Sequence, residues 1–234
     1  MAKKETVISL QVVYEDNHII AVNKPSGYLV QGDETGDIPL TEYVKNYIKI
    51  QYDKPGAVFL GVCHRLDRPV SGVVVFARTS KALERMNKLF ASQEIKKTYW
   101  AIVRERPEPF EGTLTHYLVK DTDRNVTKAL DGVSNRNPLA KKSTLTYELI
   151  ADIDGNYLVE VHPQTGRSHQ IRAQLARLGC PIVGDLKYGY KHPNPDASIS
   201  LHCKSMTFIH PTKLTEITVS SQPPNTYLWK PFLK

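Results

Sequence analysis

The apolar run Val-Val-Val-Phe-Ala at residues 73–77 constrains the fold of this chain more than any other segment does. Its residues do not alternate with polar ones, so a strand formed here would be buried on both faces. Just before it, the segment His64-Arg65-Leu66-Asp67-Arg68 places one carboxylate between two arginines. Pro69 would restrict the backbone of this loop, and Gly72 would allow it a wider range of conformations. This pattern predicts an acid at the edge of a rigid core, among cations that could hold it ionised and bind a polyanion. Taken alone, such a segment is most often an ion-paired surface loop. A functional role for Asp67 therefore depends on residues elsewhere in the chain.

Periodicity elsewhere in the chain predicts more strands than helices. Two short strands are expected around a turn within residues 12–22, and further strands at residues 60–64, 73–78, 98–104, 145–150, 157–162, 200–210 and 214–219. Helices are expected near residues 40–48, after a cap at Thr79 or Ser80, and over residues 168–178, where Gly179 would end the helix. Residues 120–143 are polar and predict a long loop. Because few helices separate consecutive strands, we expect an α+β fold with a mainly antiparallel mixed sheet and flanking helices, in one domain over residues 1–234.

Composition narrows the class of partner. The 31 lysines and arginines against 24 acidic residues give a formal charge of +7, which favours a polyanion such as a nucleic acid. No apolar run is long enough to span a bilayer, and the amino terminus lacks the apolar stretch of a secretory signal, so we expect a cytoplasmic protein without membrane contact. Cys63, Cys180 and Cys203 are widely spaced and odd in number, which indicates reduced core residues.

Several reactive sequence patterns are missing. The histidines form no His-x-x-x-His pair, and neither Gly-x-x-x-x-Gly-Lys nor Gly-x-Gly-x-x-Gly is present, so we expect no metal and no nucleotide cofactor. The coherent set that remains is one carboxylate, one tyrosine and several arginines, and it comes from three clusters: Arg65, Asp67 and Arg68; Lys96-Lys97-Thr98-Tyr99; and residues 165–172 with Arg167, His169 and Arg172. Each has a simpler interpretation, because a tyrosine on an alternating strand usually packs and helix arginines are usually solvated.

Several separated motifs in this chain resemble those of the RluA family of RNA pseudouridine synthases. The first is His64-Arg65-Leu66-Asp67 with Ser71-Gly72, and the second is Lys97-x-Tyr99-x-Ala101-x-Val103. The third is Thr165-Gly166-Arg167-Ser168-His169-Gln170-Ile171-Arg172, followed by Gly184-Asp185 and Tyr188-Gly189. With Asn23-Lys24-Pro25-Ser26-Gly27 near the start, the resemblance runs from about Val12 to Val219.

The resemblance implies roles for individual residues. Asp67 matches the essential aspartate, Tyr99 the active-site tyrosine, Arg172 the arginine that pairs with the aspartate, and Arg65 a residue that helps displace the target base. Further substrate or RNA contacts are implied at His64, Leu66, Arg68, Lys97, Arg167, His169 and Gln170. Two residues depart from the family pattern: Val70 stands where the family usually has Thr, and Gln174 where a His is common. These differences concern the conformation of the loop or the choice of substrate, and not the chemistry.

The expected activity is therefore conversion of a specific uridine in structured rRNA or tRNA to pseudouridine. The resemblance implies an active-site cleft across the sheet, a stem-loop RNA as partner, no cofactor and a monomer. No separate amino-terminal RNA-binding domain of the S4-like kind is expected. Asp67 would either attack C1′ of the ribose or remove the C2′ proton, and the sequence leaves both open.

Two other functions are weighed against this one. An RNA-binding or RNA-folding protein with dispensable catalysis would use the same basic surface, but it gives no reason for Asp67, Tyr99 and Arg172 all to be present. A hydrolase with Asp67 as nucleophile would release free uracil instead of an isomerised nucleoside.

Overall fold

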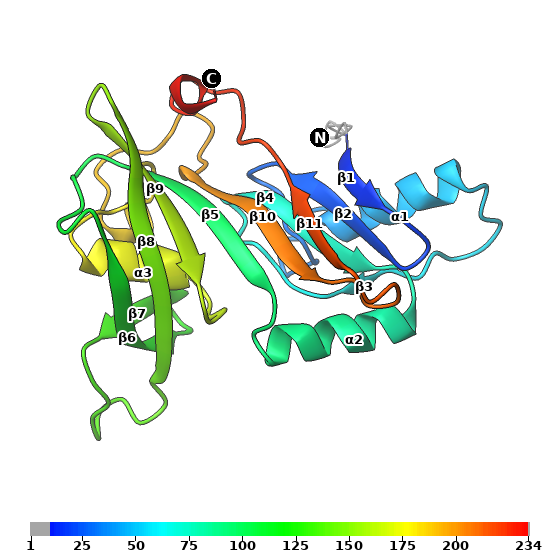
Figure 1. Cartoon of the computed structure of the whole chain (residues 1–234), viewed down its shortest axis with the longest axis horizontal. Coiled ribbons are helices and arrows are strands. Elements are labelled where there is room, and N and C mark those ends of the chain that lie inside the picture. Colours follow the sequence, from blue (N-terminus) through cyan, green and yellow to red (C-terminus); the bar gives the residue numbers. More distant parts are fainter. Residues whose placement is uncertain (1–9, 234) are drawn as a thin grey trace.

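A computed structural model describes residues 10–233. Within them one sheet of eleven strands runs through the molecule, with helices on its flanks (Figure 1). The strands are β1 (Gln11–Glu15), β2 (Ile19–Lys24), β3 (Gly61–Val62), β4 (Ser71–Ala77), β5 (Lys96–Val103), β6 (Glu111–Asp121), β7 (Val126–Leu130), β8 (Lys141–Ile153), β9 (Asn156–Pro163), β10 (Leu201–Ile209) and β11 (Glu216–Ser220). The helices are α1 (Leu40–Gln51), α2 (Ser80–Ala91) and α3 (Gln170–Arg177), with short 3₁₀ turns at Leu186–Tyr188 and Lys230–Phe232.

The strand order is β1-β2-β4-β10-β5-β9-β8-β6-β7, with β11 on β10 and β3 on β4. Only the β4–β10 pair is parallel among the pairs within the described residues, and the others are antiparallel. This confirms the α+β class with a mainly antiparallel mixed sheet. None of the helices in the described part of the chain is long and apolar enough to cross a membrane.

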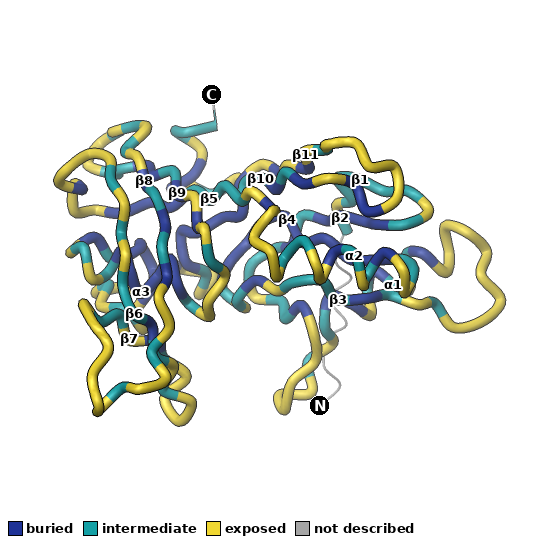
Figure 2. Tube along the Cα trace, turned by 60° about the horizontal axis from the view of Figure 1, so that its bottom comes forward, coloured by how far each residue is buried: buried dark blue, intermediate teal, exposed yellow. Residues whose placement is uncertain are grey.

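Strand β4 is buried along its whole length, as the unbroken apolar run predicted, and lies deep in the sheet (Figure 2). Its parallel contact with β10 depends on Gly72, which has φ +123°. A Cβ at Gly72 would lie 2.4 Å from both the backbone N and O of Cys203, so a side chain there would push the two strands apart. The glycine therefore fixes where the chain leaves the Asp67 loop and enters the core.

The helices pack against different parts of the sheet. The Thr79 hydroxyl accepts the N–H of Ala82 and caps α2, which packs on β3 and β4 through a stripe that includes Met86. Helix α3 packs on β6 and β7 and stops before Gly179, which has φ +89°. Helix α1 lies beside the β1–β2 end of the sheet, where the Tyr47 hydroxyl donates to Glu15 over 2.8 Å.

The long loop expected over residues 120–143 is wrong. Strand β6 continues to Asp121, turns, and returns as β7, while β8 already begins at Lys141. Within this segment only the turn at residues 122–125 and residues 131–140 lack strand structure. Burial along β6 is partial and roughly alternating, so its polar residues face solvent while the other face packs against α3. A strand with one solvent-exposed face needs few large apolar residues. Its composition therefore resembles that of a polar loop, and a prediction from composition misses it.

Candidate active site

Three segments far apart in sequence meet near the centre of the sheet. The loop before β4 carries Asp67, β5 carries Tyr99, and the first turn of α3 carries Arg172. Cys203 on β10 pairs with Gly72 on one side and with Tyr99 on the other, which brings the start of β4 next to β5. All three side chains line one cleft of about 530 Å³.

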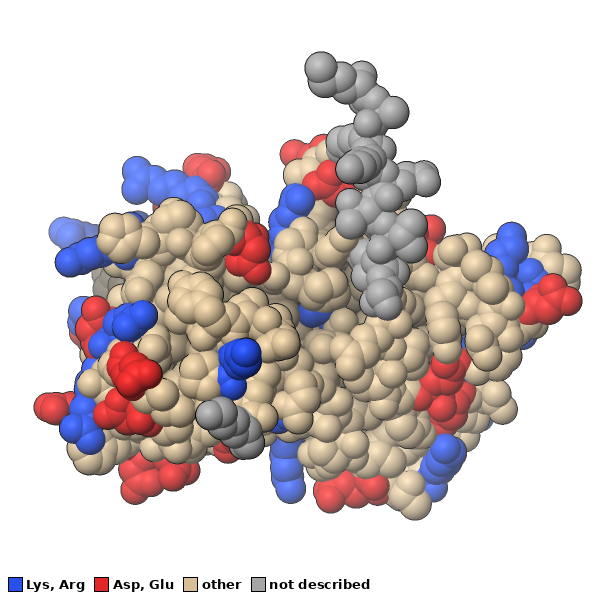
Figure 3. Space-filling model, turned by 90° about the horizontal axis from the view of Figure 1, so that it is seen from above, with Lys and Arg blue, Asp and Glu red and all other residues tan. Residues whose placement is uncertain are grey.

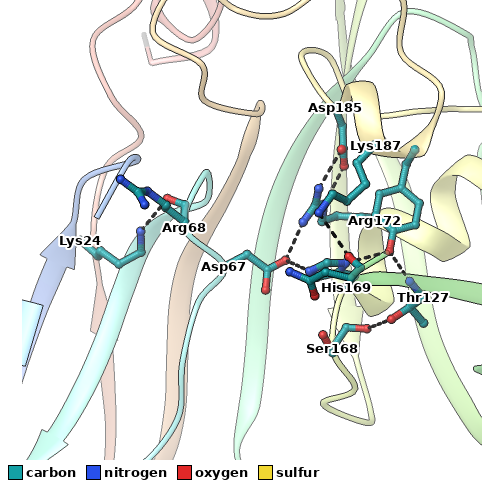
Figure 4. Close-up of polar contacts among 11 residues, drawn as sticks. Lys24, Asp67, Arg68, Thr127, Ser168, His169, Arg172, Asp185 and Lys187 are labelled. Carbon is teal, nitrogen blue, oxygen red and sulfur yellow. Dashed lines mark hydrogen bonds and ion pairs between the residues drawn. The ribbon is translucent and has the colours of Figure 1, made fainter. Parts of the chain in front are cut away.

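Asp67 is held by a buried arginine. Arg172 Nη1 donates to Asp67 Oδ2 over 2.9 Å, while its Nε and Nη2 donate to the two oxygens of Asp185 over 2.7 and 2.8 Å (Figure 4). Burial opposes the charge on Arg172, but the two carboxylates raise its pKa. The Asp67 side chain remains 29% exposed, whereas that of Asp185 is 2% exposed. Asp185 thus orients the guanidinium, and Asp67 presents its free oxygen to the cleft.

His169 is the second neighbour of Asp67. Its Nε2 lies 3.6 Å from Asp67 Oδ2, and its Nδ1 lies 2.8 Å from the Tyr188 hydroxyl. That hydroxyl already accepts the N–H of Thr127 over 2.8 Å, so it donates its own proton to Nδ1, and the ring N–H is left at Nε2. The opposite tautomer would aim a lone pair at the carboxylate. Burial lowers the pKa of His169, which favours the neutral ring in this arrangement.

The Tyr188 ring also lies under the guanidinium of Arg172, whose Cζ is 4.9 Å from the ring centroid. One tyrosine therefore contacts both groups that face Asp67. The same Tyr188 hydroxyl accepts the N–H of Thr127, which connects Arg172 and His169 to strand β7.

Tyr99 is half-buried and lines the cleft. Burial raises its pKa well above the ordinary value, and the neighbouring Cys203 thiol and the charge of Asp67 act in the same direction. The Tyr99 side chain is therefore a neutral phenol at physiological pH.

Lys24 supports the Asp67 loop from inside the protein. Its ammonium is fully buried and donates to the carbonyl oxygens of Pro25, Tyr28 and Arg68 over 3.0, 2.8 and 3.2 Å. Burial lowers the pKa of Lys24 to about 7. The sequence predicted no role for Lys24, although a lysine at the end of a strand that begins with four apolar residues, at positions 19–22, is a detectable signal.

The other predicted contact residues divide into two groups. Arg65 and Arg167 are exposed at the cleft, and Lys97 lines it from β5. Arg68 is not among the lining residues, because its side chain is bonded to Asp37 over 2.8 Å and to the Gly27 carbonyl over 3.0 Å. The structure therefore does not bring Arg68 into the cleft with the others.

Three further predicted residues line the cleft but are engaged with the protein itself. His64 accepts the N–H of Val75 over 3.0 Å, and burial lowers the pKa of its ring to about 3, so the ring is neutral. Leu66 is 7% exposed. The Gln170 amide accepts from Thr165 and from the backbone N–H of Arg167, and it braces the turn that leads into α3.

Solved structures share the fold of this chain. The fold is that of solved pseudouridine synthases, such as human RNA Pseudouridylate Synthase Domain Containing 4, with TM-score 0.76 and 24% identity over 92% of this chain and 89% of that one. Human RNA Pseudouridylate Synthase Domain Containing 1 gives TM-score 0.72 at 22% identity over 96% and 88%.

The sequence comparison then shows the family. The family model described as RNA pseudouridylate synthase matches residues 18–177. The chain is 35% identical to tRNA pseudouridine synthase C of Vibrio vulnificus over 228 residues, 91% of this chain and 90% of that one. It is 34% identical to the dual-specificity RNA pseudouridine synthase RluA of Haemophilus influenzae over 207 residues, 86% and 88%. The chain belongs to the RNA pseudouridylate synthase family, whose members are isomerases that convert uridine in RNA to pseudouridine.

Proposed function

We propose that this enzyme modifies a uridine in a tRNA or an rRNA, with Asp67 as its essential carboxylate. The observation that carries the proposal is the contact of Asp67 with Arg172 in an open cleft of about 530 Å³ that Tyr99 also lines. The class of RNA is supported by relatives whose names specify tRNA, the large ribosomal subunit, or both kinds of target.

The reaction breaks the bond between ribose C1′ and uracil N1 and joins C1′ to C5. Asp67 acts on the ribose, by attacking C1′ or by removing the C2′ proton, and Arg172 keeps the carboxylate ionised and aimed. Tyr99 stacks on the detached uracil and relays the C5 proton. Because its pKa is raised well above the ordinary value, we assign it a neutral phenol in this step and not a phenolate base.

The target base has to leave its stack to reach Asp67, which costs a few kcal/mol and least for an unpaired base. We therefore propose a loop or bulge as the target, with the exposed Arg65 entering the vacated space and Arg167 contacting phosphate. Seen from above relative to Figure 1, the centre of the molecule is mostly uncharged and charged side chains lie mainly around its edge (Figure 3). The visible part of this face carries no continuous basic surface.

Three further points belong to the proposal. The enzyme works as a single catalytic domain and as a monomer, since one sheet joins the described strands and one chain supplies all three groups of the cleft. We propose that it uses no cofactor, which agrees with a reaction that is redox-neutral and transfers no phosphate. We place the enzyme in the cytoplasm, where a tRNA or rRNA substrate would be met.

The test uses unmodified tRNA and large-subunit rRNA transcripts that carry tritium at uridine C5, because forming the new bond releases that hydrogen to water. We expect tritium release with the wild-type protein and a loss of about 10³-fold or more with Asp67→Asn at unchanged RNA affinity. Near-normal turnover of Asp67→Asn would overturn the assignment of Asp67. Release of free uracil would favour a hydrolase, and binding without any tritium release from either RNA would favour an RNA-folding protein.

A further inference from the structure

Lys97 places an ammonium inside the cleft. It precedes Tyr99 by two residues on strand β5, so both side chains project from the same face of the strand. Both line the cleft, together with Asp67. The ammonium lies beside the turn that leads to α3, since a Cβ built on Gly166 would be 3.6 Å from Lys97 Nζ.

This ammonium lacks the partners that other cations around Asp67 have. Lys24 is held by three carbonyl oxygens, and Arg172 by two carboxylates. Arg68 is paired with Asp37. Within residues 10–233, by contrast, the Lys97 ammonium makes no hydrogen bond and no ion pair, although the side chain is half-buried and burial lowers its pKa.

Removing a cation from water without a partner is costly, and structural cations in proteins are paired. The Lys97 ammonium is thus left free for an anion that enters the cleft. Two anionic oxygens arrive with the RNA, one on a backbone phosphate and one on the uracil as its bond to the ribose breaks. Arg65 and Arg167 are exposed at the cleft and can meet a backbone phosphate from solvent, whereas Lys97 is half-buried and shares its face of β5 with Tyr99. This deeper position of Lys97 favours the uracil oxygen over a backbone phosphate as the partner of its ammonium.

We propose that Lys97 is a catalytic residue that stabilises the uracil anion. This inference rests on the proposed function of Asp67 and Tyr99. When the C1′–N1 bond breaks, its electron pair stays on N1 and spreads onto the carbonyl oxygens, one of which pairs with the ammonium. C5 then bonds to C1′, the C5 proton is lost, and N1 gains a proton, so atoms and charge balance without a co-reactant.

The test compares Lys97→Met with Lys96→Met in the full chain. Methionine keeps the length of the side chain and removes the charge, and Lys96 is the neighbouring exposed residue on the other face of β5. The readouts are the tritium-release rate at saturating transcript and the dissociation constant of the same transcript between 50 and 200 mM salt, roughly the range over which phosphate contacts are resolved. Circular dichroism and thermal unfolding check that both variants fold.

For Lys97→Met we expect a rate lower by about 10²-fold, a dissociation constant within about two-fold of wild type and an unchanged salt slope, because the charge is needed only as the anion develops. Lys96→Met should stay within about two-fold in rate. Methylammonium added to Lys97→Ala should restore part of the lost rate, which a purely structural role would not allow.

The opposite pattern would assign Lys97 to a phosphate and overturn the proposal: weaker binding, a salt slope reduced by about 0.7–0.9, and a normal rate at saturation. A normal rate and normal binding would also overturn it. A wild-type protein inactive on both transcripts would instead contradict the proposed function, so the two failures are distinguishable.

Discussion

The guanidinium of Arg172 lies 2.9 Å from the carboxylate of Asp67, although 105 positions separate the two residues along the chain. The bond depends on a third group, because Asp185 accepts from two other nitrogens of the same guanidinium. Of the three side chains, only that of Asp67 is substantially exposed. The buried pair Arg172–Asp185 is therefore a fixed support, and Asp67 is the member that can meet a substrate.

Asp185→Asn should weaken both the fold and catalysis. It removes one partner of a buried charge pair, for which we expect a loss of about 3–5 kcal/mol in the free energy of unfolding. A misdirected Arg172 should also lower the rate at saturating RNA by about 10²-fold. Urea denaturation and tritium release measure the two effects. Asp131→Asn, which breaks the exposed pair with Arg177, is the control and should cost less than about 1 kcal/mol; equal losses in the two variants would contradict the support role.

Tyr188→Phe keeps the ring under Arg172 and removes the hydroxyl. The buried N–H of Thr127 then loses its acceptor, and His169 Nδ1 loses its donor, so we expect about 1–3 kcal/mol of destabilisation. ¹⁵N NMR of the His169 ring should show the proton on Nε2 in the wild type and a mixture of tautomers in the variant. A wild-type ring protonated at Nδ1 would contradict the hydrogen-bond pattern around Asp67.

Gly72→Ala should be strongly destabilising. The new Cβ would meet backbone atoms of Cys203 at 2.4 Å in a backbone conformation that L-residues rarely adopt. We expect a loss of about 3 kcal/mol or more, measured by thermal or urea unfolding. Gly56→Ala, where nothing lies within 4 Å of the new methyl group, should change stability by less than about 1 kcal/mol. If Gly72→Ala unfolded like the wild type, the parallel contact between β4 and β10 would not be as close as described.

Lys24 should make stability depend on pH. Its folded pKa of about 7 lies below the ordinary lysine value of 10.5, so between these values the unfolded chain holds a proton that the folded chain lacks. Unfolding then takes up a proton, and the free energy of unfolding rises with pH by up to about 1.4 kcal/mol per pH unit in this window. Below pH 7 the cost of burying the charge is fully present. Urea denaturation from pH 6 to 9 should show this slope in the wild type and its loss in Lys24→Met; identical slopes would show that Lys24 is not the group responsible.

Binding of the tRNA transcript should weaken with salt. Log affinity should fall linearly with log salt concentration, and Arg65→Ala or Arg167→Ala should each reduce the slope by about 0.7–0.9 if one phosphate contact is lost. Lys49→Ala on α1, exposed and remote from the cleft, is the control and should leave the slope unchanged. Fluorescence anisotropy at several salt concentrations measures the affinity and hence the slope. An affinity of the wild type that does not change with salt would argue against phosphate contacts.

Local sequence was enough to predict some parts of this fold. The unbroken apolar run identified β4 because a strand buried on both faces has no polar positions, and Thr79 marked the start of α2 because its hydroxyl can cap the first turn. The β6–β7 hairpin was missed because a strand with one wet face resembles a polar loop in composition. Asp185 and Tyr188 were noted only as members of a motif, and their contacts with Arg172 lie outside local patterns.

The sequence by itself determined the chemical groups of the site and their order along the chain, because motif residues and strand periodicity are local properties. The family resemblance implied Arg172 as the partner of Asp67, but the residues around Asp67 do not show which arginine meets it, and the contact itself is made by the tertiary structure. Arg68, its neighbour in sequence, turns away to Asp37, whereas Arg172 reaches it from α3. The reason is physical: pairing of β10 with both β4 and β5 sets these distances, and such long-range pairing leaves no trace in the residues next to Asp67.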